Sequence, residues 1–156
     1  MAESVYIESS ILSYLTARPS RDIVIAGIQE LTREWWDSQR EQYELFLSES
    51  VLKEISQGDS EASRKRMEAA FGIPSLIIDD ESMQLSRRIL QGSQLSEKSM
   101  EDSLHIAIAT VNNIEYLLTW NCRHIANAKI IPKVEQVCRN YGYQCPRICT
   151  PQELME

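Results

Sequence analysis

Short apolar runs alternate with longer segments in which apolar residues recur at helical spacing, along almost the whole chain. Runs of three to five residues rich in Val, Ile, Leu and Tyr are typical of buried strands, and the longer segments are typical of amphipathic helices. The predicted strands are residues 4–7, 43–47, 75–78, 115–119 and 147–149. The predicted helices are residues 10–17, 22–40, 48–55 or 50–55, 60–71, 80–90, 99–112 and 132–141. This alternation predicts an α/β fold in which helices cover both faces of a mainly parallel sheet.

The helix predicted over residues 99–112 has the most regular pattern. Leu104, Ala107, Ile108 and Val111 stand at i, i+3, i+4 and i+7 and form one core-facing stripe. Asp102 lies on a second stripe beside this one, which predicts a position near the edge of the sheet. The spacing Ser-x-x-Asp over residues 99–102 also fits a capping box, so a purely local role for this acid stays open.

Further acids and an amide stand at the ends of apolar runs. Glu8 follows the strand at residues 5–7, Glu54 lies among apolar neighbours at 51–55, and Asn121 follows the run at 116–120. The carboxyl ends of parallel strands meet at one edge of a sheet, where sites form, and buried charge needs compensation. Oxygen ligands gathered there predict a Mg²⁺ or Mn²⁺ site for phosphodiester chemistry. Local roles compete with this interpretation: a helix N-terminus for Glu8, a solvated helix face for Glu54, with Glu49 as its rival, and a turn for Asn121.

Composition and charge indicate the class of protein and agree with the predicted α/β fold. The 156 residues predict a single domain over 1–156, with 43% hydrophobic and 25% charged residues as in ordinary globular proteins. The apolar runs are too short to span a bilayer and no signal peptide is visible, which predicts a cytoplasmic protein. A net charge of −7 argues against nucleic-acid capture by a basic surface, although a bound cation would change the local sign. The four cysteines lack C-x-x-C pairing, which favours reduced thiols over a structural zinc site.

These residues give the chain a resemblance to the PIN-domain ribonucleases, in particular the VapC-type toxins of toxin-antitoxin pairs. The strand followed by Glu8-Ser9-Ser10 takes the place of the family's strand followed by Asp-Thr-Ser/Asn, and Glu54 matches a helical glutamate after the second strand. Residues 102–109 match the family's Asp-x-x-His/Ile-x-Ala-x-Ala segment. Residues 117–121 match a strand followed by Thr-x-Asp, except that Asn121 stands in place of the last acid.

The resemblance implies a three-layer α/β/α sandwich with a four- to five-stranded sheet, and a metal-dependent endoribonuclease that acts as a toxin. It also implies an RNA substrate, a small antitoxin partner and a homodimer. We expect Glu8, Glu54 and Asp102 to hold Mg²⁺ or Mn²⁺, with Asn121 completing the ring and Asp102 orienting or deprotonating the attacking water. The residues expected to position water or phosphate are Ser10, Thr119 and Arg123.

Two departures from the family pattern bear on activity. Glu8 is one methylene longer than the usual aspartate, so it still reaches a metal but with a changed geometry. Asn121 removes a negative charge, so we expect weaker metal binding, or a second metal that binds only with substrate. One alternative is therefore a PIN-like module that binds RNA or an antitoxin without cutting, and another is a phosphatase or DNA nuclease. For His105 and His124, a core or turn role is favoured over metal ligation.

Overall fold

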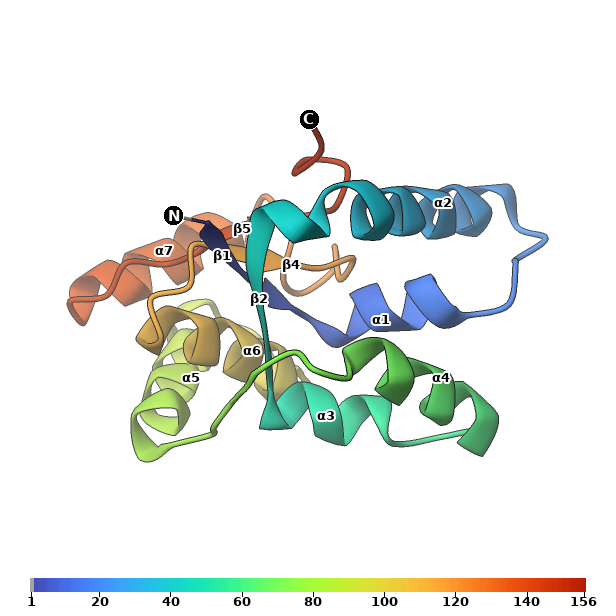
Figure 1. Ribbon diagram of the computed structural model, residues 1–156. Coiled ribbons are helices and arrows are strands. Elements are labelled where there is room, and N and C mark those ends of the chain that lie inside the picture. Colours follow the sequence, from blue (N-terminus) through green and yellow to red (C-terminus); the bar gives the residue numbers. More distant parts are fainter. Residues whose placement is uncertain (1) are drawn as a thin grey trace.

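A parallel sheet forms the centre of the molecule, shown in Figure 1 as a computed structural model that describes residues 2–156. Its strands are β1 (Glu3–Ile7), β2 (Tyr43–Ser48), β3 (Ser75–Leu76), β4 (Tyr116–Leu118) and β5 (Arg147–Cys149). The 5-stranded sheet has the order β3-β2-β1-β4-β5, and every pairing is parallel. From β1 the chain builds first toward β2 and β3 and later toward β4 and β5, so the direction of winding reverses between β1 and β4.

Helices cover both faces of this sheet. They are α1 (Ser9–Thr16), α2 (Ile23–Ser38), α3 (Glu49–Ile55), α4 (Ser60–Ala70), α5 (Asp80–Gly92), α6 (Met100–Val111) and α7 (Ile131–Asn140), with short 3-10 turns at Arg40–Gln42 and Glu97–Ser99. In Figure 1, α2 lies on one side of the strands, and α5 and α6 lie on the other. The architecture is the PIN-like three-layer α/β/α fold that the sequence predicts.

Strand periodicity decides which residues face each layer. Side chains alternate along a strand, so Tyr6 points to α6, where it meets His105, whereas Val5 points to the α2 side of the sheet. On the α2 side, the Trp35 ring stacks on Tyr43 at 5.8 Å between centroids, and its Nε1 donates to the Leu154 carbonyl at 3.2 Å. Because Glu8 follows Tyr6 by two residues in extended backbone, its side chain is directed to the α6 side as well.

Helix α6 is buried more completely than its apolar stripe predicts. Residues 103–110 are all buried, because the helix lies between the sheet and α5. Its buried polar side chains therefore need partners within the protein. Ser103 and Thr110 donate to carbonyls of their own helix, and His105 contacts neighbouring elements.

The end of α5 differs from the prediction. The sequence pattern ends this helix at Leu90, but it continues through Gly92. A Cβ atom on Gly92 would lie 2.3 Å from Cγ2 of Val137 in α7, so the missing side chain lets the two helices approach. Local sequence predicts that Gly92 ends the helix, whereas the close approach of α7 explains why a glycine stands at this position.

None of the helices within residues 2–156 is long and apolar enough to cross a membrane.

Candidate metal centre

Acids far apart in the sequence meet at the carboxyl ends of the strands. Glu8 follows β1, Glu54 lies in the helix that follows β2, and Asn121 follows β4. Asp102 joins them from the first turn of α6. Since the winding of the sheet reverses between β1 and β4, these residues lie at the topological switch point, where open α/β sheets place their ligands.

Glu8 is held by two hydroxyl groups. Its carboxylate is buried, with 5% of the residue exposed, and Oε1 accepts from Ser10 Oγ at 2.5 Å and from Thr119 Oγ1 at 2.6 Å. Each hydroxyl also accepts a backbone N–H, from Trp120 at 2.8 Å and from Asn121 at 2.9 Å. A hydroxyl has one proton, so both protons are directed to Glu8. Although Glu8 stands at the N-cap of α1, its side chain makes no capping bond, and capping does not explain the acid.

Glu54 is held in the same way from other elements. Its Oε1 accepts from Ser9 Oγ and is bonded to His105 Nε2, both at 2.6 Å. Burial raises the pKa of Glu54, but the hydrogen bonds from His105 and Ser9 outweigh it and hold this pKa below its usual value. Burial lowers the pKa of His105. The hydrogen bond to Glu54 and the charges of the surrounding carboxylates raise this pKa by a larger amount, so the net shift is upward. Glu49, the rival for the same role, is exposed.

Each glutamate has one oxygen that accepts no hydrogen bond from the described residues. Within residues 2–156, Oε2 of Glu8 and Oε2 of Glu54 accept no hydrogen bond, whereas both Oε1 atoms accept two. One ligand atom from each of Glu8, Glu54 and His105 lies within 4.8 Å of the others. A carboxylate that is fixed through one oxygen and open at the other is prepared to bind a cation through the open oxygen.

Asp102 borders this cluster and is bonded on both oxygens. Oδ1 accepts from Asn121 Nδ2 at 3.0 Å, and Oδ2 lies 3.1 Å from His124 Nδ1. Burial raises the pKa of Asp102 and so does the charge of Glu8, and these effects exceed the opposing effect of the histidines. The N-cap residue Ser99 makes no side-chain capping bond, so the capping box does not form in this described part of the chain. A cation near Asp102 would stabilise its charged form against burial and against the charge of Glu8.

The other predicted site residues occupy distinct positions. The amide of Asn121 bridges two elements: Nδ2 donates to Asp102, and Oδ1 accepts the His124 backbone N–H at 3.0 Å. Oδ1 therefore already uses one of its two lone pairs. Ser10 and Thr119 direct their protons to Glu8, and Arg123 is exposed. The predicted residues thus fall into two hydrogen-bonded groups: Glu8, Ser10, Thr119, Asn121 and Asp102 form one, and Glu54 belongs to the other, with Ser9 and His105. Arg123 belongs to neither.

Three residues that bond to the acids were not predicted as site residues: Ser9, His105 and His124. Tyr6, which bonds to His105, was not predicted either. His105 carried a usable signal, because it is the single polar residue in the apolar run 104–109 and a buried polar group needs partners. No comparable pattern distinguishes Ser9 or His124.

The chemistry of this cluster fits a hard divalent cation. The group that could hold an ion within residues 2–156 consists of Glu8, Glu54 and His105, so it offers two carboxylates and no cysteine, and Asp102 adds a third carboxylate at its border. Mg²⁺ and Mn²⁺ prefer oxygen ligands, whereas zinc sites use thiolate and imidazole more heavily. The predicted Mg²⁺ or Mn²⁺ is therefore compatible with the residues present.

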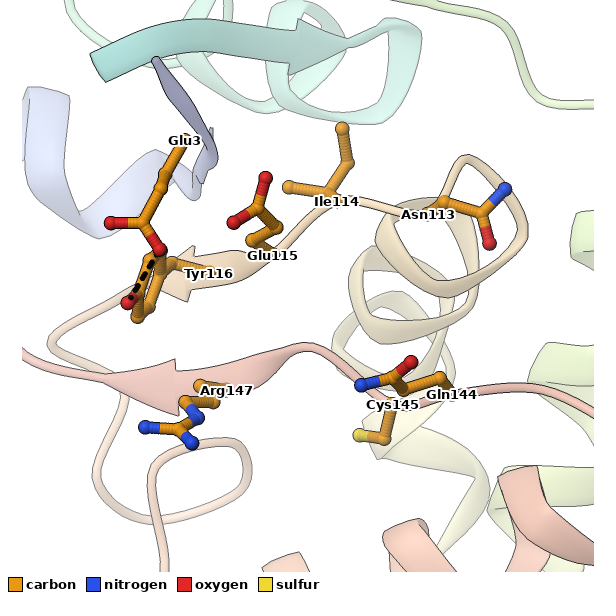
Figure 2. A pocket seen from close by; sticks show the side chains of 8 residues that line it. All are labelled: Glu3, Asn113, Ile114, Glu115, Tyr116, Gln144, Cys145 and Arg147. Carbon is orange, nitrogen blue, oxygen red and sulfur yellow. Dashed lines mark hydrogen bonds between the residues drawn. The ribbon is translucent and has the colours of Figure 1, made fainter. Parts of the chain in front are cut away.

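A separate cavity of about 360 Å³ lies at the opposite edge of the sheet. Figure 2 shows its lining, where the Tyr116 hydroxyl bonds to Glu3 at 3.1 Å and Arg147 stands nearby on β5. These residues come from the starts of the strands. Since sites in open α/β sheets form at the opposite ends, we assign the candidate site to the acidic cluster and not to this cavity.

Comparison with known proteins identifies the fold. No family model and no curated protein matches the sequence. Solved structures do match: the structure of VapBC2 from Rickettsia felis bound to a DNA fragment from their promoter has a chain with a TM-score of 0.60 and 13% identity, covering 94% of this chain and 98% of that one. A chain of FitAB bound to an IR36 DNA fragment gives a TM-score of 0.61 and 12% identity, covering 97% and 98%. The protein has the fold of VapC-type toxin structures over nearly its whole length, which confirms the resemblance at the level of the fold.

Proposed function

We propose that this protein is a Mg²⁺- or Mn²⁺-dependent endoribonuclease that acts as the toxin of a toxin-antitoxin pair. One observation carries the proposal: Glu8 and Glu54 are each fixed through Oε1 and open at Oε2, next to Asp102, at the switch point of the sheet. The motifs that hold these residues resemble those of PIN-domain ribonucleases. The similar fold of chains in the VapBC2 and FitAB complexes supports the toxin role and an antitoxin partner.

The proposed reaction is hydrolysis of an RNA phosphodiester bond. Glu8, Glu54 and Asp102 would hold the ion, which when bound supplies charge neutralisation at the scissile phosphate and acidification of a water. Ser10 and Thr119 keep Glu8 in place through their protons, and Asp102 would orient the attacking water or accept its proton. Cleavage would leave a 5′-phosphate and a 3′-hydroxyl.

The test is Mn²⁺-dependent cleavage of RNA by single variants. We expect Asp102→Ala and Glu54→Gln to lower the cleavage rate by at least about 100-fold, the upper end of losses caused by removing a residue that only supports a metal ligand. Glu49→Gln is the matched control, because Glu49 lies exposed on the same helix as Glu54 and should leave the rate unchanged. Wild-type rates in Asp102→Ala and Glu54→Gln would remove the assignment.

A second function is a module that binds without cutting. It is favoured by Asn121, which replaces an acid, and by Asp102, both of whose oxygens are already bonded. Calorimetric titration with Mn²⁺ separates the two: absence of binding at millimolar metal supports the non-catalytic module. Parallel assays on structured RNA, single-stranded DNA and a small phosphate ester separate the ribonuclease from a DNA nuclease or phosphatase.

An exposed apolar turn supports the proposed protein partners. At the start of α2, Ile23 is 86% exposed and Val24 is 68% exposed. Contiguous apolar surface of this kind is commonly buried by another protein, and the net charge of −7 favours a partner with a basic segment. We expect Val24→Asp to weaken either antitoxin binding or homodimer formation, measured by light scattering with and without the partner, while metal-dependent cleavage is retained. Unchanged association in both measurements would exclude this turn as the interface.

A further inference from the structure

A row of buried hydrogen bonds runs from the backbone of α3 to the Glu54 carboxylate. The Val51 N–H donates to Ser48 Oγ at 3.2 Å, and Ser48 Oγ lies 2.7 Å from the Tyr6 hydroxyl. The same hydroxyl lies 2.7 Å from His105 Nδ1, and His105 Nε2 lies 2.6 Å from Glu54 Oε1. The side chains that connect Val51 to Glu54 are those of Ser48, Tyr6 and His105, and all three residues are fully buried.

The backbone N–H sets the direction of every proton in this row. It can only donate, so Ser48 Oγ accepts it and gives its own proton to Tyr6. In the neutral His105 ring the Tyr6 proton then goes to Nδ1, which leaves the ring hydrogen on Nε2, directed to Glu54. In the reverse direction Tyr6 would donate to Ser48, and the Ser48 proton would have no other acceptor within residues 2–156. A buried donor without an acceptor is costly, so the first direction is favoured.

We infer that His105 is a positioning residue that holds Glu54 with Oε2 directed to the cation, and that Tyr6 and Ser48 fix the ring in the tautomer this requires. The inference rests on the proposed function, in which the site binds a divalent cation. His105 does not serve as a ligand, although its ring lies within the acidic cluster. Its Nδ1 lone pair accepts from Tyr6, and its Nε2 carries the proton given to Glu54.

Glu54 needs such support because of its place in the fold. It lies near the end of a seven-residue helix and projects a long side chain with several rotatable bonds toward the site. Two donors on Oε1, from Ser9 and His105, fix the carboxylate plane; one donor alone would allow it to rotate about that bond. Glu8 has the same arrangement, with two donors on Oε1 and none on Oε2. Partners that orient a metal ligand in this way commonly change metal affinity by about 10- to 100-fold.

The donor set that follows is entirely oxygen. With His105 committed to Glu54 and Tyr6, the cluster offers carboxylates and water but no free imidazole lone pair. This composition selects Mg²⁺ and Mn²⁺ over zinc, which binds imidazole well. The commitment of His105 to Glu54 and Tyr6 is therefore a physical reason why the proposed enzyme would use Mg²⁺ or Mn²⁺.

The tautomer can be measured in the unaltered protein without metal. Nitrogen-15 NMR of the His105 ring, on the alkaline plateau of its titration, should show a protonated Nε2 and an unprotonated Nδ1. Addition of Mg²⁺ should leave the proton on Nε2. A ring that carries its hydrogen on Nδ1, or that loses the Nε2 proton when Mg²⁺ binds, would overturn the inference, and no variant has to fold for this result.

Metal affinity tests the positioning role directly. By calorimetry, Tyr6→Phe and His105→Leu should weaken Mn²⁺ binding by about 10- to 100-fold. His105→Gln should restore most of the affinity, because its amide can donate to Glu54 from near the position of Nε2. Tyr116→Phe is the matched control, since that hydroxyl bonds only to Glu3 at the opposite edge of the sheet. Thermal unfolding in EDTA identifies any variant that does not fold. For such a variant, the NMR measurement on the unaltered protein takes the place of the affinity test.

The outcomes separate this inference from the proposed function. If the unaltered protein binds Mn²⁺ and Tyr6→Phe binds it equally well, the positioning role is wrong and the metal site stands. If the unaltered protein binds no Mn²⁺, the proposed function and the positioning role both fall. Weakened binding in Tyr6→Phe with restoration in His105→Gln supports both.

Discussion

The hydroxyl of Thr119 gives a direct measure of how firmly Glu8 is held. Thr119 is fully buried at the end of β4, where it donates to Glu8 Oε1 at 2.6 Å and accepts the Asn121 backbone N–H at 2.9 Å. Thr119→Val keeps the shape of the side chain but removes both the donor and the acceptor. The substitution therefore tests the hydrogen bonds with little change in packing.

The expected cost follows from these two bonds. A hydrogen bond to a charged group contributes about 1.5–3 kcal/mol, and a stranded donor costs about 1–3 kcal/mol when buried. Because Asn121 is only half-buried, the lower end applies to its N–H. The sum is roughly 2.5–4 kcal/mol, and for a chain of this size about 2–4 °C of Tm is lost per kcal/mol. We expect the metal-free variant to melt roughly 5–15 °C below the unaltered protein.

The assay is urea unfolding in EDTA, compared with Thr110→Val. Thr110 is equally buried but makes one neutral bond, to the Ile106 carbonyl at 2.7 Å. Its loss should cost about 0.5–1.5 kcal/mol. If Thr119→Val costs no more than Thr110→Val, the Thr119 hydroxyl does not hold a charged Glu8, and the description of the site given above is wrong.

Two further predictions concern the framework around the site. Gly92→Ala should destabilise the protein by about 1–3 kcal/mol in urea unfolding, because the new Cβ would meet Val137, whereas Gly27→Ala in open space should stabilise it by about 0.5–1 kcal/mol. Equal effects would contradict the packing of α5 on α7. Asp79 caps α5, and the hydrogen bonds from Ser82 hold its pKa below the usual value. Its contribution of about 1 kcal/mol should be present above the unfolded pKa and lost as pH falls through the lower folded pKa, so Asp79→Ala should cost stability at neutral pH only, while Asp79→Asn should show no such pH dependence.

Local patterns were sufficient for most of the fold. Apolar runs and helical spacing predicted the strands and helices to within a few residues, because burial and backbone preference act over short stretches of chain. Ser48, one of two proposed caps for α3, accepts the Val51 N–H as a capping residue should. The prediction was wrong at the end of α5, which continues through Gly92, and a side chain at this position would meet Val137 of another helix.

The candidate site was predicted as a set of residues and not as a set of contacts. Sequence order and strand ends predicted that Glu8, Glu54 and Asp102 share one ion. The fold brings ligand atoms of Glu8, Glu54 and His105 within 4.8 Å of one another, with Asp102 at the border of this group, and the shared ion stays a prediction. The sequence did not indicate that Ser10 and Thr119 would direct their protons to Glu8. Their expected role in positioning water or phosphate remains a prediction.

By itself, the sequence determined the alternation of strands and helices, the end of the sheet at which acids gather, and the oxygen chemistry they offer. Tertiary structure alone decided which carboxylate oxygen is engaged and which is open. It also turned His105 from a buried ring into the group that orients Glu54, 51 residues away, and joined Thr119 to Glu8 across 111 residues. Local pattern reports whether a residue is buried, whereas its hydrogen-bond partner depends on how distant strands and helices are placed beside one another.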